Sequence, residues 1–223
     1  VTVNLANLAA QNTGGAGIDT LSGIENLSGS AFNDTLSGST LANVIAGGAG
    51  LDTIAGGLGN DVLQGGTGSD IFRFDSLLNA ATNVDTISDF AVPDDTLQLS
   101  GSIFSGIAAG TLGASAFQLG TAANDAGDRI VYDSATGNIY YDANGNGAGA
   151  QTLFARVAAG TALTNLDFSV TAAAAAPVTK TPVQEARPGA LVEGETATPS
   201  PAHANLVAFN GMSFAHEADY LLS

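Results

Sequence analysis

The chain has no cysteine, few basic residues and no long apolar run, and each absence removes a class of function. Without cysteine, disulfide staples and thiolate metal sites are excluded. Lys and Arg number 5 against 21 Asp and Glu, and the formal net charge of −16 repels nucleic acids and anionic membranes. No apolar run approaches the roughly 18 residues of a spanning helix, so we expect no membrane insertion.

Histidine is scarce as well, which bears on catalysis. His203 and His216 both lie near the end of the chain, so residues 1–170 contain no HExxH zinc motif and no Ser–His–Asp triad. Paired carboxylates are plentiful, but in this context they indicate metal ligands or solvated turns rather than glycosidase acids. We therefore expect no catalytic residue and no organic cofactor in this chain. Any catalytic domain would lie upstream of Val1.

The first residues lack the features of a leader segment. The chain opens VTVNLANLAA, without a methionine or a basic stretch, which predicts that it has no N-terminal signal peptide. It reads as part of a longer polypeptide, and an upstream domain is the expected neighbour.

Glycine and aspartate are abundant, and between Gly29 and Arg73 they recur with a period of nine. The units are GSAFNDTLS, GSTLANVIA, GGAGLDTIA, GGLGNDVLQ and GGTGSDIFR. A sustained period of this kind predicts a stacked solenoid in which each repeat is one supersecondary unit. The sixth places are Asp34, Asn43, Asp52, Asp61 and Asp70; the eighth places are Leu36, Ile45, Ile54, Leu63 and Phe72.

The residue types predict a turn followed by a short strand in each unit. In the first six places, glycine allows a tight turn whose backbone carbonyls point inward. In the last three, an extended segment buries the middle side chain and exposes the two beside it. Two units then make one coil of a flattened, right-handed parallel β-roll. Loops beginning at 29, 47 and 65 should stack on one edge, and those at 38 and 56 on the other. A further nonapeptide begins at Gly14; if Gly23 makes a turn, its loop joins the first edge.

The loops have the composition of a calcium site. Calcium takes six to eight oxygen ligands from carboxylates and carbonyls. A Gly-Gly-x-Gly-x-Asp loop offers several carbonyls and one short carboxylate, and two stacked loops would complete a shell. The alternative is a glycine-rich turn with solvated aspartates, which six near-copies disfavour. Because one buried side chain per nine residues makes a thin core, bound cations should be part of the fold.

Beyond residue 74 the period ends. The stretches 85–90, 94–100 and 129–147 predict antiparallel strands and hairpins, 152–157 a further strand, and 163–170 a closing segment, with at most one short helix near 74–82. We interpret 1–74 as the roll, 75–170 as a β-rich cap, 171–202 as an Ala/Pro/Thr-rich linker and 203–223 as a tail, a candidate secretion signal. The expected class is all-β with a mostly disordered C-terminal tail.

One motif in the cap needs separate consideration. Asp142, Asn144, Asn146 and Gly147 match the first half of an EF-hand loop, but Leu153 stands where the bidentate glutamate belongs. A hairpin turn is the better interpretation.

The repeat segment GGAGLDTIAGGLGNDVLQGGTGSDIFRF resembles the nonapeptide arrays of the RTX family, the haemolysin-type calcium-binding repeats. The later arrangement DIFRF…DTISDF…DDTLQLS, and the segment NLDFSV, resemble the C-terminal domain of serralysin-type secreted metalloproteases over residues 14–170. The resemblance implies a parallel β-roll that binds several calcium ions, without the protease itself.

The family pattern also implies ligands. The earlier loop of a pair gives carbonyls from its second and fourth places and its sixth-place Asp; the later loop gives carbonyls from its first and third places and its Asp. Carried over, one site joins Gly48, Gly50 and Asp52 to Gly65, Thr67 and Asp70. A second joins Ser30, Phe32 and Asp34 to Gly47, Ala49 and Asp52, and a third joins Gly15, Gly17 and Asp19 to Gly29, Ala31 and Asp34.

The other edge departs from the pattern. Ser39, Leu41 and Asn43 face Gly56, Leu58 and Asp61, so that site lacks one charge and should be weaker or empty. Gly57, Gly59 and Asp61 need a partner beyond Phe74, for which Asp85 and Asp89 are candidates.

Three functions are compatible with these features. The first is a calcium-binding RTX module of a secreted bacterial protein, which would pass through a type I secretion machinery and fold on extracellular calcium. The second is a non-catalytic accessory domain of a secreted protease, lipase or polysaccharide-modifying enzyme. The third is a calcium-dependent assembly domain of a surface layer or adhesin.

Overall fold

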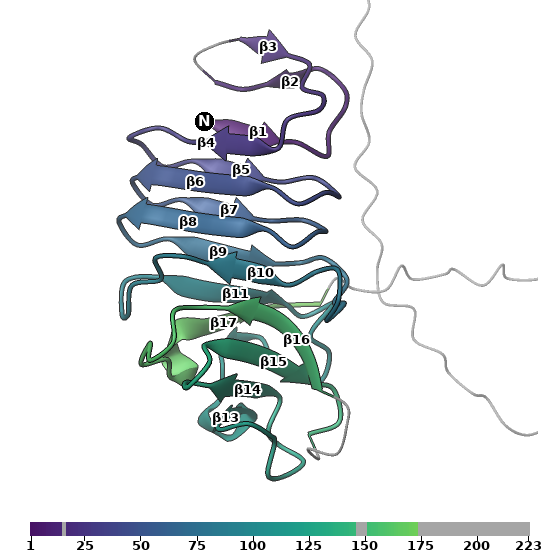
Figure 1. The fold of residues 1–223 in the computed structure, drawn as a ribbon, viewed down its shortest axis with the longest axis vertical. Coiled ribbons are helices and arrows are strands. Elements are labelled where there is room, and N and C mark those ends of the chain that lie inside the picture. Colours follow the sequence, from purple (N-terminus) through teal and green to yellow (C-terminus); the bar gives the residue numbers. More distant parts are fainter. Residues whose placement is uncertain (15–16, 146–150, 174–223) are drawn as a thin grey trace, which may run out of the picture. The chain divides into compact units, whose positions relative to one another are not determined.

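The computed structural model describes residues 1–14, 17–145 and 151–173, which belong to one compact unit (Figure 1). The predicted linker and tail lie outside these residues, except for 171–173. Within the described part the elements are strands and two short 3₁₀ turns, η1 (Ala114–Ala116) and η2 (Asn165–Asp167), and no helix is long and apolar enough to cross a membrane.

Two large sheets face each other. The first, in spatial order, consists of β1 (Thr2–Asn4), β5 (Thr35–Ser37), β7 (Thr53–Ala55), β9 (Ile71–Phe74), β11 (Thr96–Ser100), β17 (Phe168–Thr171) and β12 (Gly110–Thr111). The second consists of β13 (Phe117–Leu119), β14 (Ile130–Asp133), β15 (Asn138–Asp142), β16 (Gln151–Arg156), β10 (Asp85–Ile87), β8 (Val62–Thr67), β6 (Val44–Ala49) and β4 (Asn26–Ser28). A separate hairpin consists of β2 (Gln11–Asn12) and β3 (Ile18–Asp19).

Within the repeats the chain alternates between the two sheets and forms a parallel β-roll, as predicted. Thr35 lies opposite Thr53 in the first sheet, and Val44 lies opposite Val62 in the second, so each strand pairs in parallel with the strand 18 residues away. The successive coils are visible as stacked layers in Figure 1. A strand of about three residues per nonapeptide suffices because the remaining six turn the chain toward the other sheet.

The interior contains the eighth-place side chains. Each of these is 0% exposed, because in an extended x-U-x segment only the middle side chain points inward. The predicted core of the roll is therefore confirmed. Its members are Leu36, Ile45, Ile54, Leu63 and Phe72.

The roll continues past residue 74, where antiparallel strands were predicted, so that expectation is wrong for two strands. β10 pairs in parallel with β8, with Ile87 opposite Leu63, and β11 pairs in parallel with β9, with Leu97 opposite Phe72. The additional residues lie in the loops 75–84 and 88–95, and the strands keep the alternation that buries Ile87 and Leu97. Residues 75–84 form a loop, not the short helix expected there.

The cap is joined to the roll through continuous sheets. β14 and β15 form the predicted antiparallel hairpin, and β15 pairs antiparallel with β16, which in turn pairs in parallel with β10. Edge-to-face contacts of Phe154 with Phe74 and Phe104, at 5.1 and 5.0 Å between ring centroids, fill the space where roll and cap meet.

The EF-hand-like segment contains a turn in its described part. Asp142 Oδ1 accepts hydrogen bonds from the backbone N–H groups of Asn144 at 3.1 Å and Gly145 at 2.8 Å, which agrees with the predicted hairpin turn. Asn146 and Gly147 lie outside the described residues.

The N-terminal segment differs from the prediction. β1 pairs in parallel with β5 and occupies the position next to the loop 29–34, while within the β2–β3 hairpin the N–H of Thr13 donates to the Gly17 carbonyl. Asp19 accepts a hydrogen bond from Thr13 Oγ1 at 2.6 Å. The loop beginning at Gly14 therefore does not stack directly on loop 29–34, because the start of β1 lies in that position.

Candidate metal centres on the two loop edges

The turns of the roll form two edges. Loops 29–34, 47–52 and 65–70 run from the second sheet to the first and form the first edge; loops 38–43 and 56–61 run back and form the second edge. This is the division that the repeat spacing predicted. Each loop ends in its sixth-place Asp or Asn, immediately before a strand, so the strand pairing brings these side chains into rows.

On the first edge a backbone N–H of the preceding coil donates a hydrogen bond to the side chain of each following aspartate. The backbone N–H of Asp34 donates to Asp52 Oδ1 at 2.8 Å, and the N–H of Asp52 donates to Asp70 Oδ1 at 2.9 Å. The row continues beyond the repeats, because the N–H of Asp70 donates to Asp95 Oδ1 at 2.9 Å. A carboxylate oriented by a backbone amide cannot turn away from the edge without losing that hydrogen bond.

The second edge has the same arrangement. The N–H of Asn43 donates to Asp61 Oδ1 at 2.6 Å, and the N–H of Asp61 donates to Asp85 Oδ1 at 3.2 Å. Asp85, one of the two candidates for the partner of Asp61, therefore lies where the prediction requires it. We call the two sets of aspartates and asparagine the carboxylate rows.

One oxygen of several row members has no partner in the protein. The Oδ2 atoms of Asp52, Asp61 and Asp70 are buried and accept no hydrogen bond, although each of these residues is only 1% exposed. A buried carboxylate oxygen without a donor is strongly unfavourable unless a cation or a proton neutralises it. These atoms therefore mark places where a cation fits.

The space around these oxygens depends on the first glycine of each loop. A Cβ on Gly47 would collide with Asp52 Oδ2 and lie 2.7 Å from the Gly65 carbonyl oxygen. On the second edge a Cβ on Gly56 would collide with Asp61 Oδ2 and lie 2.9 Å from Asp85 Oδ2. Glycine at this place thus keeps open a cradle lined by carboxylate and carbonyl oxygens, the donor set that calcium prefers.

The electrostatics of the rows favour cation binding. Burial raises the pKa of Asp52, Asp70 and Asp95, and nearby carboxylates act in the same direction. On the second edge burial raises the pKa of Asp61 to about 6 and, together with the neighbouring Asp61 carboxylate, that of Asp85 to about 8. Each row is a set of like charges held close together in a poorly hydrated place.

The structure brings together the residues of two predicted sites on the first edge. The loops containing Gly48, Gly50 and Asp52 lie against those containing Gly65, Thr67 and Asp70, and the N–H of Gly50 donates to the carbonyl of Thr67 at 2.9 Å. Loop 29–34 likewise lies against loop 47–52, with the N–H of Ala49 donating to the carbonyl of Ser30 at 3.2 Å. A carbonyl oxygen that accepts one hydrogen bond keeps a second lone pair for a metal ion.

The third predicted site is not brought together. Asp19 bonds to Thr13 within its own hairpin, and the amino group of Val1 contacts Asp34 Oδ1 instead. Gly17 lies in the same hairpin turn, and Gly15 lies outside the described residues. Of that site, Gly29, Ala31 and Asp34 remain as one loop of the first edge. The spacing of 15 between the loops, in place of 18, already departed from the period.

Asp89 also lies elsewhere than predicted. Its Oδ1 accepts from the N–H of Gly65 at 3.0 Å and its Oδ2 from the N–H of Gly66 at 2.9 Å, so it belongs to the first edge and not beside Asp61. The reason is the strand between them: β10 crosses from the second edge to the first, and Asp85 and Asp89 stand at its opposite ends. Gly57, Gly59 and Asp61 therefore face Asp85 alone.

The side chain of Asn43, in the second row, already makes hydrogen bonds with other groups of the protein. Asn43 Oδ1 accepts from Ser39 N–H at 2.8 Å, and its amide group donates to the Glu25 carbonyl at 3.2 Å. Its loop does lie against loop 56–61, since the N–H of Leu58 donates to the Ser39 carbonyl at 3.0 Å. The weaker site expected between Ser39, Leu41, Asn43 and Gly56, Leu58, Asp61 stays a prediction.

Each gap between stacked loops offers at most two row carboxylates, and the gap between Asn43 and Asp61 offers one. Across the described residues no group of three or more Asp, Glu, His or Cys side chains converges on one point. The rest of a coordination shell must therefore come from loop carbonyls, which the glycine-rich turns supply. Such a shell of oxygens suits calcium and excludes the softer metals that prefer nitrogen and sulfur.

Asp95 was not among the sequence-predicted ligands. It follows Asp70 by 25 residues, not 18, so a search at the repeat period does not find it. The signal that could have found it is the segment DDTLQLS, in which an aspartate directly precedes an alternating strand, as in four of the five nonapeptides.

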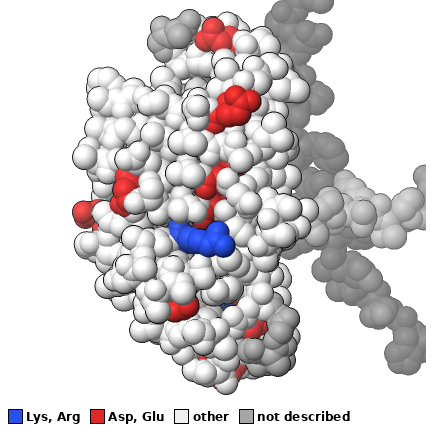
Figure 2. Space-filling model, viewed as in Figure 1, with Lys and Arg blue, Asp and Glu red and all other residues white. Residues whose placement is uncertain are grey.

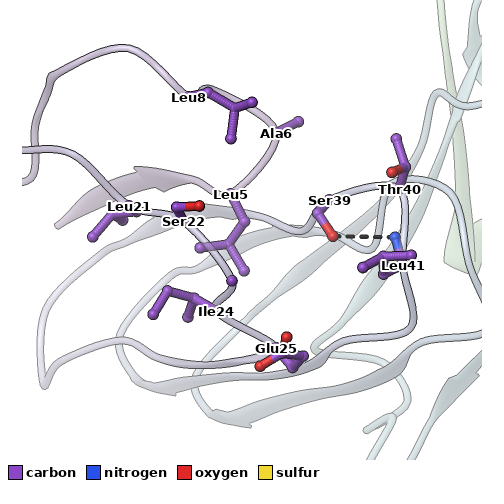
Figure 3. A pocket seen from close by; sticks show the side chains of 11 residues that line it. Leu5, Ala6, Leu8, Leu21, Ser22, Ile24, Glu25, Ser39, Thr40 and Leu41 are labelled. Carbon is purple, nitrogen blue, oxygen red and sulfur yellow. Dashed lines mark hydrogen bonds between the residues drawn. The ribbon is translucent and has the colours of Figure 1, made fainter.

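Among the described residues, the charged surface and the pocket at the start of the roll differ from the loop edges. Figure 2 shows acidic groups spread over one face as separate patches, whereas the row carboxylates are buried. A pocket of about 300 Å³ lies at the start of the roll (Figure 3). Its walls are mainly apolar, including Leu5, Leu8, Leu21 and Leu41, and Glu25 is its only titratable side chain. Ser39, Thr40 and Leu41 of loop 38–43 also line it, but none of the sixth-place Asp or Asn side chains does.

A match to one known family of repeats agrees with this geometry. Residues 21–40 and 37–72 match the family of RTX calcium-binding nonapeptide repeats, in four copies. No curated protein shows a significant match.

The chain is similar to the solution structure of the AlgE6R3 subunit of the Azotobacter vinelandii mannuronan C5-epimerase, with 22% identity, a TM-score of 0.43, and 89% of this chain and 100% of that chain covered. It is also similar to the AlgE6R2 subunit of the same enzyme, with 23% identity, a TM-score of 0.38, and 66% and 93% covered. Residues 21–72 are RTX calcium-binding nonapeptide repeats, and they form the stacked coils of a β-roll.

Proposed function

We propose that this chain is a calcium-triggered folding module of a secreted protein, with calcium held between stacked loops of the two edges. On the first edge the ions lie between loops 29–34, 47–52 and 65–70; on the second edge an ion lies between Asp61 and Asp85. The observation that supports this most directly is the set of buried, unpartnered Oδ2 atoms in the carboxylate rows.

Calcium acts here on folding and not as a catalyst. The rows place carboxylates close together, and without calcium these carboxylates repel each other along both edges. The core, with one large side chain per nonapeptide, offsets little of this repulsion. A cation that binds only the folded form stabilises it by RT ln(1 + [L]/Kd). The affinity of the ions thus becomes folding free energy.

This dependence fits a protein that is exported before it folds. In a compartment with little free calcium the repeats stay unfolded and can pass a narrow channel, such as that of a type I secretion system. Outside, where extracellular modules bind calcium at about 10⁻⁴–10⁻³ M, the roll closes. The parent protein would use the module as an accessory domain, with any activity located elsewhere.

The first test is the response of the secondary structure to calcium. Far-UV circular dichroism of the chain in a chelator should show a largely unfolded spectrum, and addition of calcium to about 10⁻³ M should produce β-structure. Magnesium at the same concentration should not, because it demands a small octahedral shell and releases its water reluctantly. A spectrum that is the same in chelator and in calcium would overturn the proposal.

Calcium binding should also strengthen as the pH rises from about 6 to about 8. Burial raises the pKa values of Asp61 to about 6 and of Asp85 to about 8, above the unfolded value near 3.9, so the calcium-free fold keeps these carboxyls protonated and loses stability as the pH rises. Calcium requires the ionised form, so binding must release protons below about pH 8. The calcium midpoint, titrated at pH 6, 7 and 8, should fall with pH. Asp85→Asn should flatten this dependence; an equally steep slope in that variant would contradict it.

A further inference from the structure

We propose that Asn60 is a positioning residue of the second edge: its side-chain oxygen holds the end of loop 75–84 in place and so keeps Asp85 opposite Asp61. The inference rests on the proposed function, because it assumes that a cation lies between these two aspartates. Asn60 is not one of the proposed ligands. It acts through the backbone N–H of Val84, the residue directly before Asp85.

The contact has the same form at two places in the roll. Asn60 stands at the fifth place of its nonapeptide, and its Oδ1 accepts the N–H of Val84 at 2.9 Å. Asn33 stands at the fifth place of the first nonapeptide, and its Oδ1 accepts the N–H of Leu51 at 2.9 Å. Leu51 directly precedes Asp52. In both cases the asparagine fixes the backbone immediately before the next aspartate of its row.

Loop 75–84 has no repeat sequence that could set the position of the aspartate after it. Inside the loop, Asn83 Nδ2 donates to the carbonyl oxygen of Leu77 at 2.7 Å, which closes the loop on itself. The contact from the preceding coil comes from Asn60, whose side chain reaches Val84 at the end of the loop. This side chain therefore links the irregular loop to the regular ones.

The hydrogen bond within the carboxylate row is long at this point. The N–H of Asp61 donates to Asp85 Oδ1 at 3.2 Å, whereas the other N–H contacts of the two rows measure 2.6 to 2.9 Å. A hydrogen bond at the upper end of the usual range of distances holds its partner less firmly. The Asn60 contact therefore contributes more to the position of Asp85 than a fifth-place residue does where the row contact is short.

Burial determines how much each asparagine contact matters. Val84 is 3% exposed, whereas Leu51 is 56% exposed. If the side chain of Asn33 is truncated, water can take its place at Leu51. A buried N–H that loses its acceptor costs more, because it keeps the full desolvation penalty. Loss of the Asn60 oxygen therefore favours a shift of the loop end, and Asp85 moves with it.

The first test compares Asn60→Ala with the matched variant Asn33→Ala in the full chain. Both side chains are exposed, so neither truncation opens a cavity in the core. Followed by circular dichroism, the calcium midpoint of folding should rise about two- to fivefold for Asn60→Ala, as expected for one hydrogen bond. It should change less than about twofold for Asn33→Ala. Equal shifts in the two variants, or no shift in Asn60→Ala, would overturn the inference.

The conservative variant Asn60→Asp separates the hydrogen bond from other effects of the truncation. It has the same size and keeps an oxygen that can accept the N–H of Val84. Its added charge also lies close to the cation. The calcium midpoint should therefore return to the unsubstituted value or fall below it. A midpoint as high as that of Asn60→Ala would contradict a role through this hydrogen bond.

A site-resolved measurement distinguishes positioning from a general loss of stability. In anomalous difference maps of terbium-loaded crystals, the peak between Asp61 and Asp85 should weaken in Asn60→Ala relative to the peak between Asp52 and Asp70. A purely structural role would leave the ratio of the two peaks as it is in the unsubstituted chain, and that result would overturn the inference alone. No peak at any loop of the unsubstituted chain would overturn the proposed function and this inference with it.

Discussion

Asp52→Ala should raise the calcium concentration at the midpoint of folding by about tenfold or more, which corresponds to about 1.4 kcal/mol. Asp52 belongs to two neighbouring gaps on the first edge: its Oδ1 accepts the Asp34 N–H, its own N–H donates to Asp70, and its Oδ2 is free for a cation. The substitution therefore removes one carboxylate from two sites at once. Circular dichroism during a calcium titration measures the midpoint directly.

Two further variants separate loss of a ligand from loss of a structural contact. Asp52→Asn keeps an acceptor for the Asp34 N–H, so its calcium midpoint should also rise, while the calcium-free chain gains stability from the lost repulsion with Asp34. Asn43→Ala removes the side-chain hydrogen bonds of Asn43 with Ser39 and Glu25 but no charge, so it should lower stability without a comparable shift in midpoint. Equal shifts for Asp52→Ala and Asn43→Ala would show that the two edges do not differ as we propose.

Phe154→Ala should destabilise the calcium-loaded chain by about 3–5 kcal/mol, the usual range for a buried Phe replaced by Ala. Phe154 is 1% exposed and makes edge-to-face contacts with Phe74 at the end of the roll and with Phe104. Its loss opens a cavity where the sheets of the roll continue into the cap. Urea unfolding at saturating calcium gives the free energy.

The matched control is Leu166→Ala, an apolar truncation at a position that is 73% exposed. It should change the free energy of unfolding by no more than about 0.5 kcal/mol. If Phe154→Ala proves as mild, the cap does not support the roll through this aromatic contact. If it abolishes the calcium transition altogether, the roll depends on the cap for folding itself and not only for stability.

The period of nine predicted the stacked coils of the repeats, because there each nonapeptide alone determines its turn and its buried side chain. Gly29 begins a turn and Leu36 enters the core for reasons contained within one nonapeptide, and repetition extends this to every coil. The assignment of loops to the two edges was predicted in the same way. Each strand carries the chain from one edge to the other, so every second loop lies on the same edge.

The parts that were missed are those in which a loop changes length while the strand pairing persists. Ile87 and Leu97 continue the core at spacings of 24 and 25, and only the three-dimensional pairing shows that they are further coils. Asp85 and Asp89 were equal candidates for the partner of Asp61 because the sequence does not show which end of β10 faces which edge. Likewise, β1 takes the position expected for loop 14–19 through a pairing with β5 over 33 residues. Long-range choices of this kind depend on which strand edge is free, and a local pattern does not contain that information.

The alternation between sheets also limits how such an array can grow. An inserted unit of nine residues would move every later strand to the opposite sheet and every later loop to the opposite edge, so that an insertion between Asp61 and Asp70 would move Asp70 into the row of Asp61. An insertion of 18 residues restores both rows, because Thr53 then still meets a strand of its own sheet. The natural increment of this architecture is thus a pair of nonapeptides, and lineages of such arrays should differ in length by even numbers of units wherever both edges bind calcium.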